Sequence, residues 1–134
     1  MKRFALALIF GLSSAFLLSA CVAEEGPITG TTNATVLSGS VFTQTERVLV
    51  GGTQMIVRGT VKNTSKVTWS PVWIVEGQFY YDSTFTFKLG GATKSFSFSL
   101  AKGEATAFEL KFTSSTYDLS DYPNFAVKNL RAVQ

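Results

Sequence analysis

The chain has 134 residues, a formal net charge of +3, one cysteine and no histidine. Histidine is the commonest general base and the commonest metal ligand, and a lone cysteine closes no disulfide within the chain and builds no thiolate metal site. No run of basic residues marks a nucleic-acid surface. The composition therefore argues against zinc enzymes and nucleic-acid-binding proteins, and we expect neither a cofactor nor a metal.

The first 20 residues follow the order of a secretory signal peptide. Two basic residues open the chain, and an apolar run extends from Phe4 to Leu18 before two small residues. This run is shorter than the about 20 apolar residues of a membrane-spanning helix, and its charged start and small-residue end are typical of an export signal. We therefore predict a helical signal peptide over residues 1–20, cleaved between Ala20 and Cys21. The alternatives are a permanent N-terminal membrane anchor and a buried helix.

The residues before the cleavage point and the cysteine after it, Leu18-Ser19-Ala20-Cys21, resemble the lipobox of bacterial lipoproteins. The resemblance implies that the Cys21 thiol receives a diacylglycerol. It also implies that cleavage before Cys21 frees the α-amino group of this residue, which is then acylated with a fatty acid such as palmitate. Stable anchoring requires two acyl chains, so membrane lipid is a predicted partner through Cys21. In Gram-negative lipoproteins Asp at the next position favours inner-membrane retention, and Val22 stands there. The resemblance thus implies the outer membrane, on its periplasmic leaflet or its surface.

Residues 21–34 are predicted to form a lipid-anchored tether, because they are mostly polar and include glycine and proline. A flexible coil of about 12 residues spans about 20 Å on average, which keeps the following domain close to the bilayer. Residues 35–134 are predicted to form one domain. The two basic residues near the start leave with the signal peptide, which lowers the net charge from +3 to +1.

The domain alternates apolar and polar side chains over short segments separated by turn residues. A period of two is the pattern of half-buried strands, and antiparallel strands with one apolar face bury it against a second sheet. We predict an all-β fold, an antiparallel β-sandwich of seven or eight strands, with a barrel as the alternative. Turns are expected at Gly51-Gly52, Gly90-Gly91 and Gly103. The expected strands are residues 35–43, 48–50, 54–62, 72–81, 85–89, 95–100, 107–112 and 125–133, and the expected core residues are Val57, Val61, Phe96, Phe98, Phe108 and Leu110.

The alternation fails once, within residues 72–81. Strict alternation places Val72, Ile74 and Glu76 on the same face of the strand. If that face meets the core, the carboxylate of Glu76 would point into the core as well. We predict a β-bulge at Glu76 and Gly77, because one extra residue in the strand exchanges its two faces.

Three segments carry a second family resemblance. They are Val57–Thr64, the residues Tyr80-Tyr81-Asp82, and Leu100–Glu104, which leads into the next expected strand. Together they resemble the FxLYD-type domain, an immunoglobulin-like sandwich of many prokaryotic lipoproteins. The resemblance covers residues 48–133 and implies immunoglobulin-like topology and a cell-envelope module without catalytic activity.

Aromatic residues crowd the stretch 69–81, and three of them are candidate contacts for a partner. These are Trp69, Trp73 and Tyr80. Aromatic side chains on a solvent face bind sugars or partner proteins. Alternation places Tyr80 opposite the two tryptophans, so we expect Tyr80 to point outward. The alternative is that most of these rings belong to the core.

Asp118 and Asp121, flanked by Tyr117 and Tyr122, form an acidic aromatic loop. Two carboxylates three residues apart suit a shared Ca²⁺ ion or an acid–base pair, but so few ligands favour the capping of a helical turn.

We expect a non-catalytic binding or structural module, tethered to the membrane of the cell envelope. Its expected partner is an envelope protein or a glycan, and not a nucleic acid. One alternative is an accessory lipoprotein without a fixed partner. The other is a hydrolase that uses Asp118 and Asp121.

Overall fold

The computed structural model describes residues 34–134. The predicted signal peptide, its cleavage point after Ala20, the predicted lipidation site Cys21 and residues 21–33 of the predicted tether lie outside the described residues. Within residues 34–134, no helix is long and apolar enough to cross a membrane.

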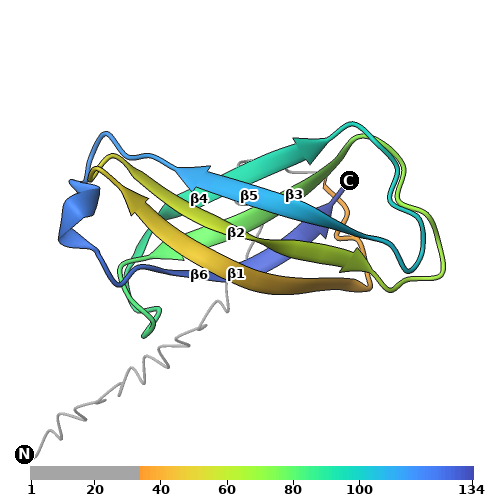
Figure 1. Cartoon of the computed structure of the whole chain (residues 1–134), viewed down its shortest axis with the longest axis horizontal. Helices are drawn as coiled ribbons and strands as arrows, with labels where there is room; N and C mark the ends of the chain where they lie inside the picture. The colour runs from red at the N-terminus through yellow and green to blue at the C-terminus, as the bar shows by residue number, and fades with distance from the viewer. Residues whose placement is uncertain (1–33) are drawn as a thin grey trace, which may run out of the picture.

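Two antiparallel sheets of three strands each pack face to face (Figure 1). One sheet has the strand order β1-β2-β5 and the other the order β4-β3-β6. The predicted all-β antiparallel sandwich is therefore confirmed. The strands are β1 (Ser40–Val50), β2 (Gln54–Asn63), β3 (Trp73–Tyr80), β4 (Lys88–Phe96), β5 (Ala105–Phe112) and β6 (Ala126–Val133), and a single 3₁₀ turn, η1 (Leu119–Asp121), precedes β6.

The connections give the sandwich an immunoglobulin-like Greek key. Strand β2 pairs with β5, while β3 and β4 form a hairpin in the facing sheet. The β1–β2, β3–β4 and β5–β6 connections lie at one end of the molecule, and the β2–β3 and β4–β5 connections lie at the other (Figure 1). Loops distant in sequence thus meet at each end, which is where such sandwiches carry their variable surfaces.

The described residues form six strands, fewer than predicted, because two pairs of expected segments are continuous. The first pair joins in β1, whose register against β2 shifts between Gln44 and Glu46. Phe42 and Leu49 are an odd number of positions apart, so strict alternation would place them on opposite faces of the strand. The extra residue of the bulge puts both on the core face, where they pack against the same core. Strict alternation therefore breaks within one strand.

The second pair joins in β4, and the predicted turn at Gly90-Gly91 is wrong. The strand runs through both glycines, which pair with Phe79 and Gln78 of β3. A Cβ atom at Gly90 would collide with the ring of Phe112 from the facing sheet. Glycine here allows a close approach between the two sheets.

The core fills the space between the sheets, and five of its six predicted members are buried. The exception is Phe98, which is 47% exposed because β4 ends at Phe96. The chain turns inward again at Leu100, which pairs with Trp69 in an isolated bridge. The confirmed core residues are Val57, Val61, Phe96, Phe108 and Leu110.

The predicted bulge within β3 is wrong, because β3 pairs with β4 without interruption from Trp73 to Phe79. The register shift lies between β3 and β6, where Glu76 pairs with Arg131 and Gln78 pairs with Lys128. Between these two pairs the chain advances by three residues in β6 and by two residues in β3. The bulge, with its one extra residue, therefore lies in β6. Glu76 lies on the outer face of its sheet, where its Oε2 accepts a hydrogen bond from Nε of Arg131 at 2.8 Å.

Candidate functional site

The two tryptophans proposed as partner contacts are core residues, so that prediction is wrong for both. Trp69 is 1% exposed and Trp73 is 0% exposed. The Trp73 ring stacks on Phe96 at a centroid distance of 4.2 Å, and its Nε1 donates a hydrogen bond to the carbonyl of Phe98 at 2.8 Å. The Trp69 ring meets the Trp73 ring edge-on at 5.3 Å. Neither ring has surface left for a partner.

Tyr80 lies on the outer face of β3, opposite the tryptophans, but its side chain is only 8% exposed. Its hydroxyl donates a hydrogen bond to Oε1 of Gln78 at 2.8 Å. Phe85, from the β3–β4 connection, packs edge-on against its ring at 5.3 Å. The prediction that Tyr80 presents an outward contact surface is therefore wrong, because a loop side chain covers it.

The acidic loop contains the expected capping interaction. The Asp118 Oδ1 atom accepts hydrogen bonds from the backbone N–H of Ser120 at 3.0 Å and from the Ser120 hydroxyl at 2.6 Å. The bond from the Ser120 hydroxyl, followed by the one from its N–H, lowers the pKa of Asp118. One carboxylate thus caps η1 and stays ionised, while Asp121 is exposed. Within residues 34–134, no three acidic, cysteine or histidine side chains gather as metal ligands.

The structure brings together four aromatic side chains at the end of the sandwich that carries η1; we call this group the aromatic end. Tyr81 follows β3, Phe87 precedes β4, and Tyr117 and Tyr122 flank η1. Neighbouring rings meet edge-on at centroid distances between 5.8 and 6.5 Å. The three tyrosines are half-buried and Phe87 is 44% exposed. The rings therefore brace one another and still reach solvent.

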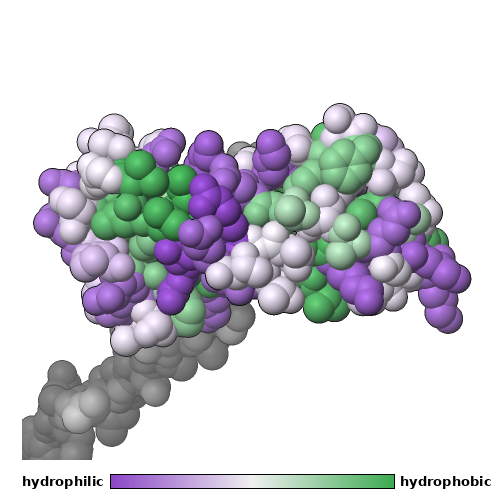
Figure 2. Space-filling model, in the orientation of Figure 1, coloured by the Kyte–Doolittle hydropathy of each residue, from purple (hydrophilic) through white to green (hydrophobic). Residues whose placement is uncertain are grey.

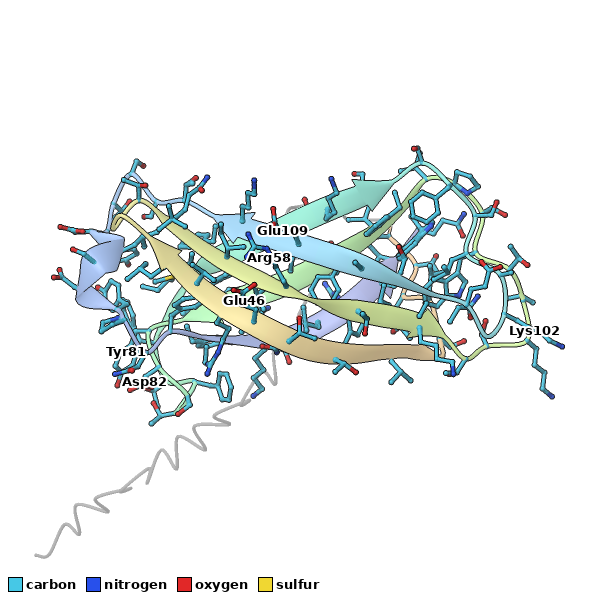
Figure 3. All side chains as sticks on the ribbon, in the orientation of Figure 1. Glu46, Arg58, Tyr81, Asp82, Lys102 and Glu109 are labelled. Atoms are coloured by element: carbon cyan, nitrogen blue, oxygen red, sulfur yellow. The ribbon has the colours of Figure 1, made fainter. Side chains whose placement is uncertain are left out.

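An open hollow of about 540 Å³ lies at the same end of the molecule. Tyr81 and Tyr122 each come directly before residues that line it, and their rings are 6.5 Å apart. Figure 3 shows Tyr81 and Asp82 at this end, near η1, and Lys102 at the opposite end. The lining residues are Arg47, Leu49, Asp82, Ser83, Pro123, Asn124 and Phe125.

The two charged side chains of the hollow are held by neighbouring groups. The Arg47 Nη1 atom donates a hydrogen bond to the carbonyl of Phe125 at 2.9 Å. The Asp82 Oδ1 atom accepts hydrogen bonds from the hydroxyl and the N–H of Thr84, at 2.5 and 2.9 Å. These bonds, the hydroxyl first, lower the pKa of Asp82, so its carboxylate is ionised at neutral pH. One positive and one negative group leave the hollow nearly balanced in charge.

One feature of the sequence could have indicated the aromatic end, although the alternation of apolar and polar residues does not reveal it. Each tyrosine of the aromatic end stands next to an aspartate in a connection between strands, as in Tyr81-Asp82 and Tyr117-Asp118. A Greek key places the β3–β4 and β5–β6 connections at one end, where Tyr81 meets Tyr122 and Phe87 meets Tyr117.

The outer face of the β1-β2-β5 sheet is a second surface, and it shows a small hydrophobic patch beside a hydrophilic band (Figure 2). Val48 and Ile56 pair directly across β1 and β2. The band centres on Arg58, whose guanidinium bonds Glu46 at 2.8 Å and Glu109 at 2.6 Å (Figure 3). Exposed ion pairs such as these contribute little to stability. The apolar contact between β1 and β2 is an ordinary cross-strand pair, which stabilises the sheet and does not indicate a binding site. The aromatic end is therefore the stronger candidate.

Comparison of the chain with family models, with curated proteins and with solved structures found no match. The resemblances to lipoproteins and to FxLYD-type domains remain predictions from the sequence.

Proposed function

We propose that this protein is a lipoprotein of the cell envelope, anchored by acylated Cys21, and that its sandwich is a non-catalytic module that binds an envelope component through the aromatic end. The observation that carries the proposal is the group of four solvent-reaching rings beside an open polar hollow. Half-exposed aromatic side chains are favoured at binding surfaces because they offer large contact area with little conformational freedom to lose.

The geometry of the described chain suits an anchored module. Thr35 exchanges backbone hydrogen bonds of 2.9 Å with Gln134, just past the end of β6. The described chain thus begins in the half of the sandwich away from η1 (Figure 1). An anchor attached there leaves the aromatic end accessible, and confinement at a membrane raises the effective concentration of neighbours, so weak contacts suffice.

The lipid anchor is tested by substituting Cys21→Ser, which removes the only thiol in the chain. We expect the variant to lose acylation and to accumulate as the unprocessed precursor, because the thiol is the acceptor in the lipobox chemistry. The measurement is metabolic labelling with a palmitate analogue, together with the mass of the purified protein. Labelling and cleavage that persist in Cys21→Ser rule out the anchor.

The binding function is tested in living cells with a photoreactive amino acid at position 117, in place of the half-exposed Tyr117. We expect a discrete crosslinked species, because this ring lies in the proposed contact surface. The matched control is the same photoreactive residue at Phe98, an exposed aromatic position at the opposite end. Only diffuse background at position 117 supports the rival reading, an accessory lipoprotein without a fixed partner.

The rival hydrolase would need Asp118 or Asp121 as an acid or base. Asp118 already caps η1 through two hydrogen bonds to Ser120. A carboxylate held ionised by hydrogen bonds is a poor general acid, so the geometry favours a structural role.

A further inference from the structure

We propose that the end of the sandwich opposite η1 docks on the surface of an anionic phospholipid bilayer. The proposal rests on the proposed lipid anchor and goes beyond it, because it assigns the part of the sandwich that meets the membrane. Two connections form this end, residues 64–72 between β2 and β3 and residues 97–104 between β4 and β5; we call them the docking end (Figure 1).

Large apolar side chains of the docking end are exposed to solvent. In the β2–β3 connection Val67 is 65% exposed and Val72 is 56% exposed, and Phe98 of the β4–β5 connection is exposed as well. Such side chains contribute little to the core, and they gain hydrophobic free energy when they enter the boundary between lipid headgroups and acyl chains. The docking end therefore offers the apolar part of a membrane contact.

The apolar side chains of the docking end stand on a braced backbone. The buried amide of Asn63 donates hydrogen bonds to the carbonyls of Val67 and Leu100, one in each connection, at 2.8 and 2.9 Å. The Phe98 ring meets the buried ring of Trp73 edge-on at a centroid distance of 6.3 Å. The two connections are thus held together in advance, which reduces the conformational entropy lost on docking.

The charges at the two ends of the sandwich favour one orientation. At the docking end the exposed Lys66 and Lys102 outnumber Glu104 (Figure 3). All aspartates of the described chain lie in the connections at the opposite end, and these connections contain no lysine or arginine. Lysines near an anionic bilayer are attracted to it, and carboxylates are repelled. The docking end is therefore the end that such a bilayer attracts.

The length of the sandwich separates these two groups of charges. Strands of 8 to 11 residues join the ends. At about 3.3 Å per residue they span about 30 Å, which is several times the screening length of about 8 Å at physiological salt. A docked chain thus brings its lysines to the headgroups and keeps its aspartates outside the range of the surface potential.

The position of the proposed anchor favours the same orientation. Thr35 exchanges backbone hydrogen bonds with Gln134, whose side-chain amide donates to the carbonyl of Ser70 in the β2–β3 connection at 3.0 Å. The predicted tether therefore joins the sandwich beside the docking end. A coil of about 12 residues spans about 20 Å on average, so the anchor keeps this end near the bilayer, where weak contacts suffice.

The test measures the depth of a spin label in the processed lipoprotein, purified from cells and reconstituted in vesicles of phosphatidylethanolamine and phosphatidylglycerol. The label is attached at Val67→Cys, the only free thiol once Cys21 is acylated. Oxygen reaches labels in lipid, and a water-soluble nickel complex reaches labels in water. We expect the label at position 67 to lie within the bilayer interface. The matched control is Val50→Cys, at an exposed valine beside the aromatic end, whose label should stay in water.

The charge contribution is tested with the double variant Lys66→Gln, Lys102→Gln in the same labelled chain. Each lysine near an anionic surface contributes about a fivefold change in partition, so the variant should lower the ratio of docked to undocked chains roughly 25-fold. Both lysines are exposed, so the substitutions leave the core intact. Vesicles of neutral phosphatidylcholine should weaken docking of the parent chain in the same way.

Flotation of the vesicles distinguishes this proposal from the anchor on which it rests. A chain that floats with the vesicles while its label at position 67 stays in water overturns docking and leaves the anchor in place. A chain that does not float overturns the anchor, and docking with it. Equal depth at positions 67 and 50 overturns the assignment of the docking end. Docking that is equally strong on phosphatidylcholine, or in the double variant, overturns the selection of anionic lipid.

Discussion

Trp73→Ala should lower the free energy of unfolding by about 3–5 kcal/mol, the range for removal of a large buried aromatic side chain. The Trp73 side chain is fully buried, and its ring stacks on Phe96 at 4.2 Å. Alanine leaves a cavity between the sheets and removes the donor that Nε1 offers to the carbonyl of Phe98 at 2.8 Å. The measurement is urea denaturation of the full chain, followed by circular dichroism.

A second substitution separates the two contributions. Trp73→Phe keeps an aromatic ring against Phe96 and loses the hydrogen bond, so its cost should be well below that of Trp73→Ala. The control is Val41→Ala, at a side chain that is 50% exposed, which should change stability by less than about 0.5 kcal/mol. A loss below about 1 kcal/mol in Trp73→Ala would contradict the packing described for this end of the core.

Strand identity could be predicted where one face of a strand meets the core and the other meets water. In β5, Phe108, Leu110 and Phe112 are buried and alternate with more exposed residues, as the period of two requires. Turns could be predicted where the backbone itself demands glycine. Gly51 and Gly103 have φ angles of 55° and 80°, which side chains with a Cβ rarely adopt.

Gly90 and Gly91 could not be interpreted from the sequence. The pair Gly90-Gly91 looks like the pair Gly51-Gly52, yet it lies within a strand. The difference depends on the ring of Phe112, which comes from the other sheet and from more than 20 positions away along the chain. Local sequence does not contain such a contact.

The candidate site could be predicted only in part, for a similar reason. Alternation correctly placed Tyr80 on the face opposite Trp73, but whether that face is exposed depends on Phe85 in the following loop. The aromatic end is assembled by two connections, β3–β4 and β5–β6, that the Greek key brings together. Its members Tyr81 and Tyr117 are 36 positions apart in the sequence. Neither can be recognised as part of a site until the fold brings the two loops together.

Asn63 joins the two connections at the end of the sandwich opposite η1, and its buried side chain makes four hydrogen bonds. Its Nδ2 donates to the carbonyls of Val67 and Leu100 at 2.8 and 2.9 Å. Its Oδ1 accepts from the N–H and the hydroxyl of Ser65 at 3.0 and 2.6 Å. This amide therefore uses both of its donors and both acceptor positions, which makes it hard to replace.

Asn63→Leu should lower the free energy of unfolding by about 2–4 kcal/mol, since each of the four lost bonds is worth about 0.5–1.5 kcal/mol and relaxation recovers part of that. Asn63→Asp should cost at least as much at neutral pH, although it keeps the shape of the side chain. The carboxylate has no donor for the carbonyls of Val67 and Leu100, so a buried negative charge faces two carbonyl oxygens.

The pH dependence of Asn63→Asp distinguishes this electrostatic cost from a simple loss of shape. Burial beside carbonyl oxygens raises the pKa of the introduced carboxyl in the folded state above the value of about 3.9 in the unfolded chain. The penalty is then complete above the folded-state pKa and shrinks as the pH falls toward about 4, where the protonated group regains one donor. Urea denaturation at several pH values measures this trend relative to the wild-type chain. The matched control is Asn124→Asp, the same change at an exposed amide, which should show little penalty. An Asn63→Asp penalty that is small at pH 7, or that grows as the pH falls, would contradict the role assigned to this amide.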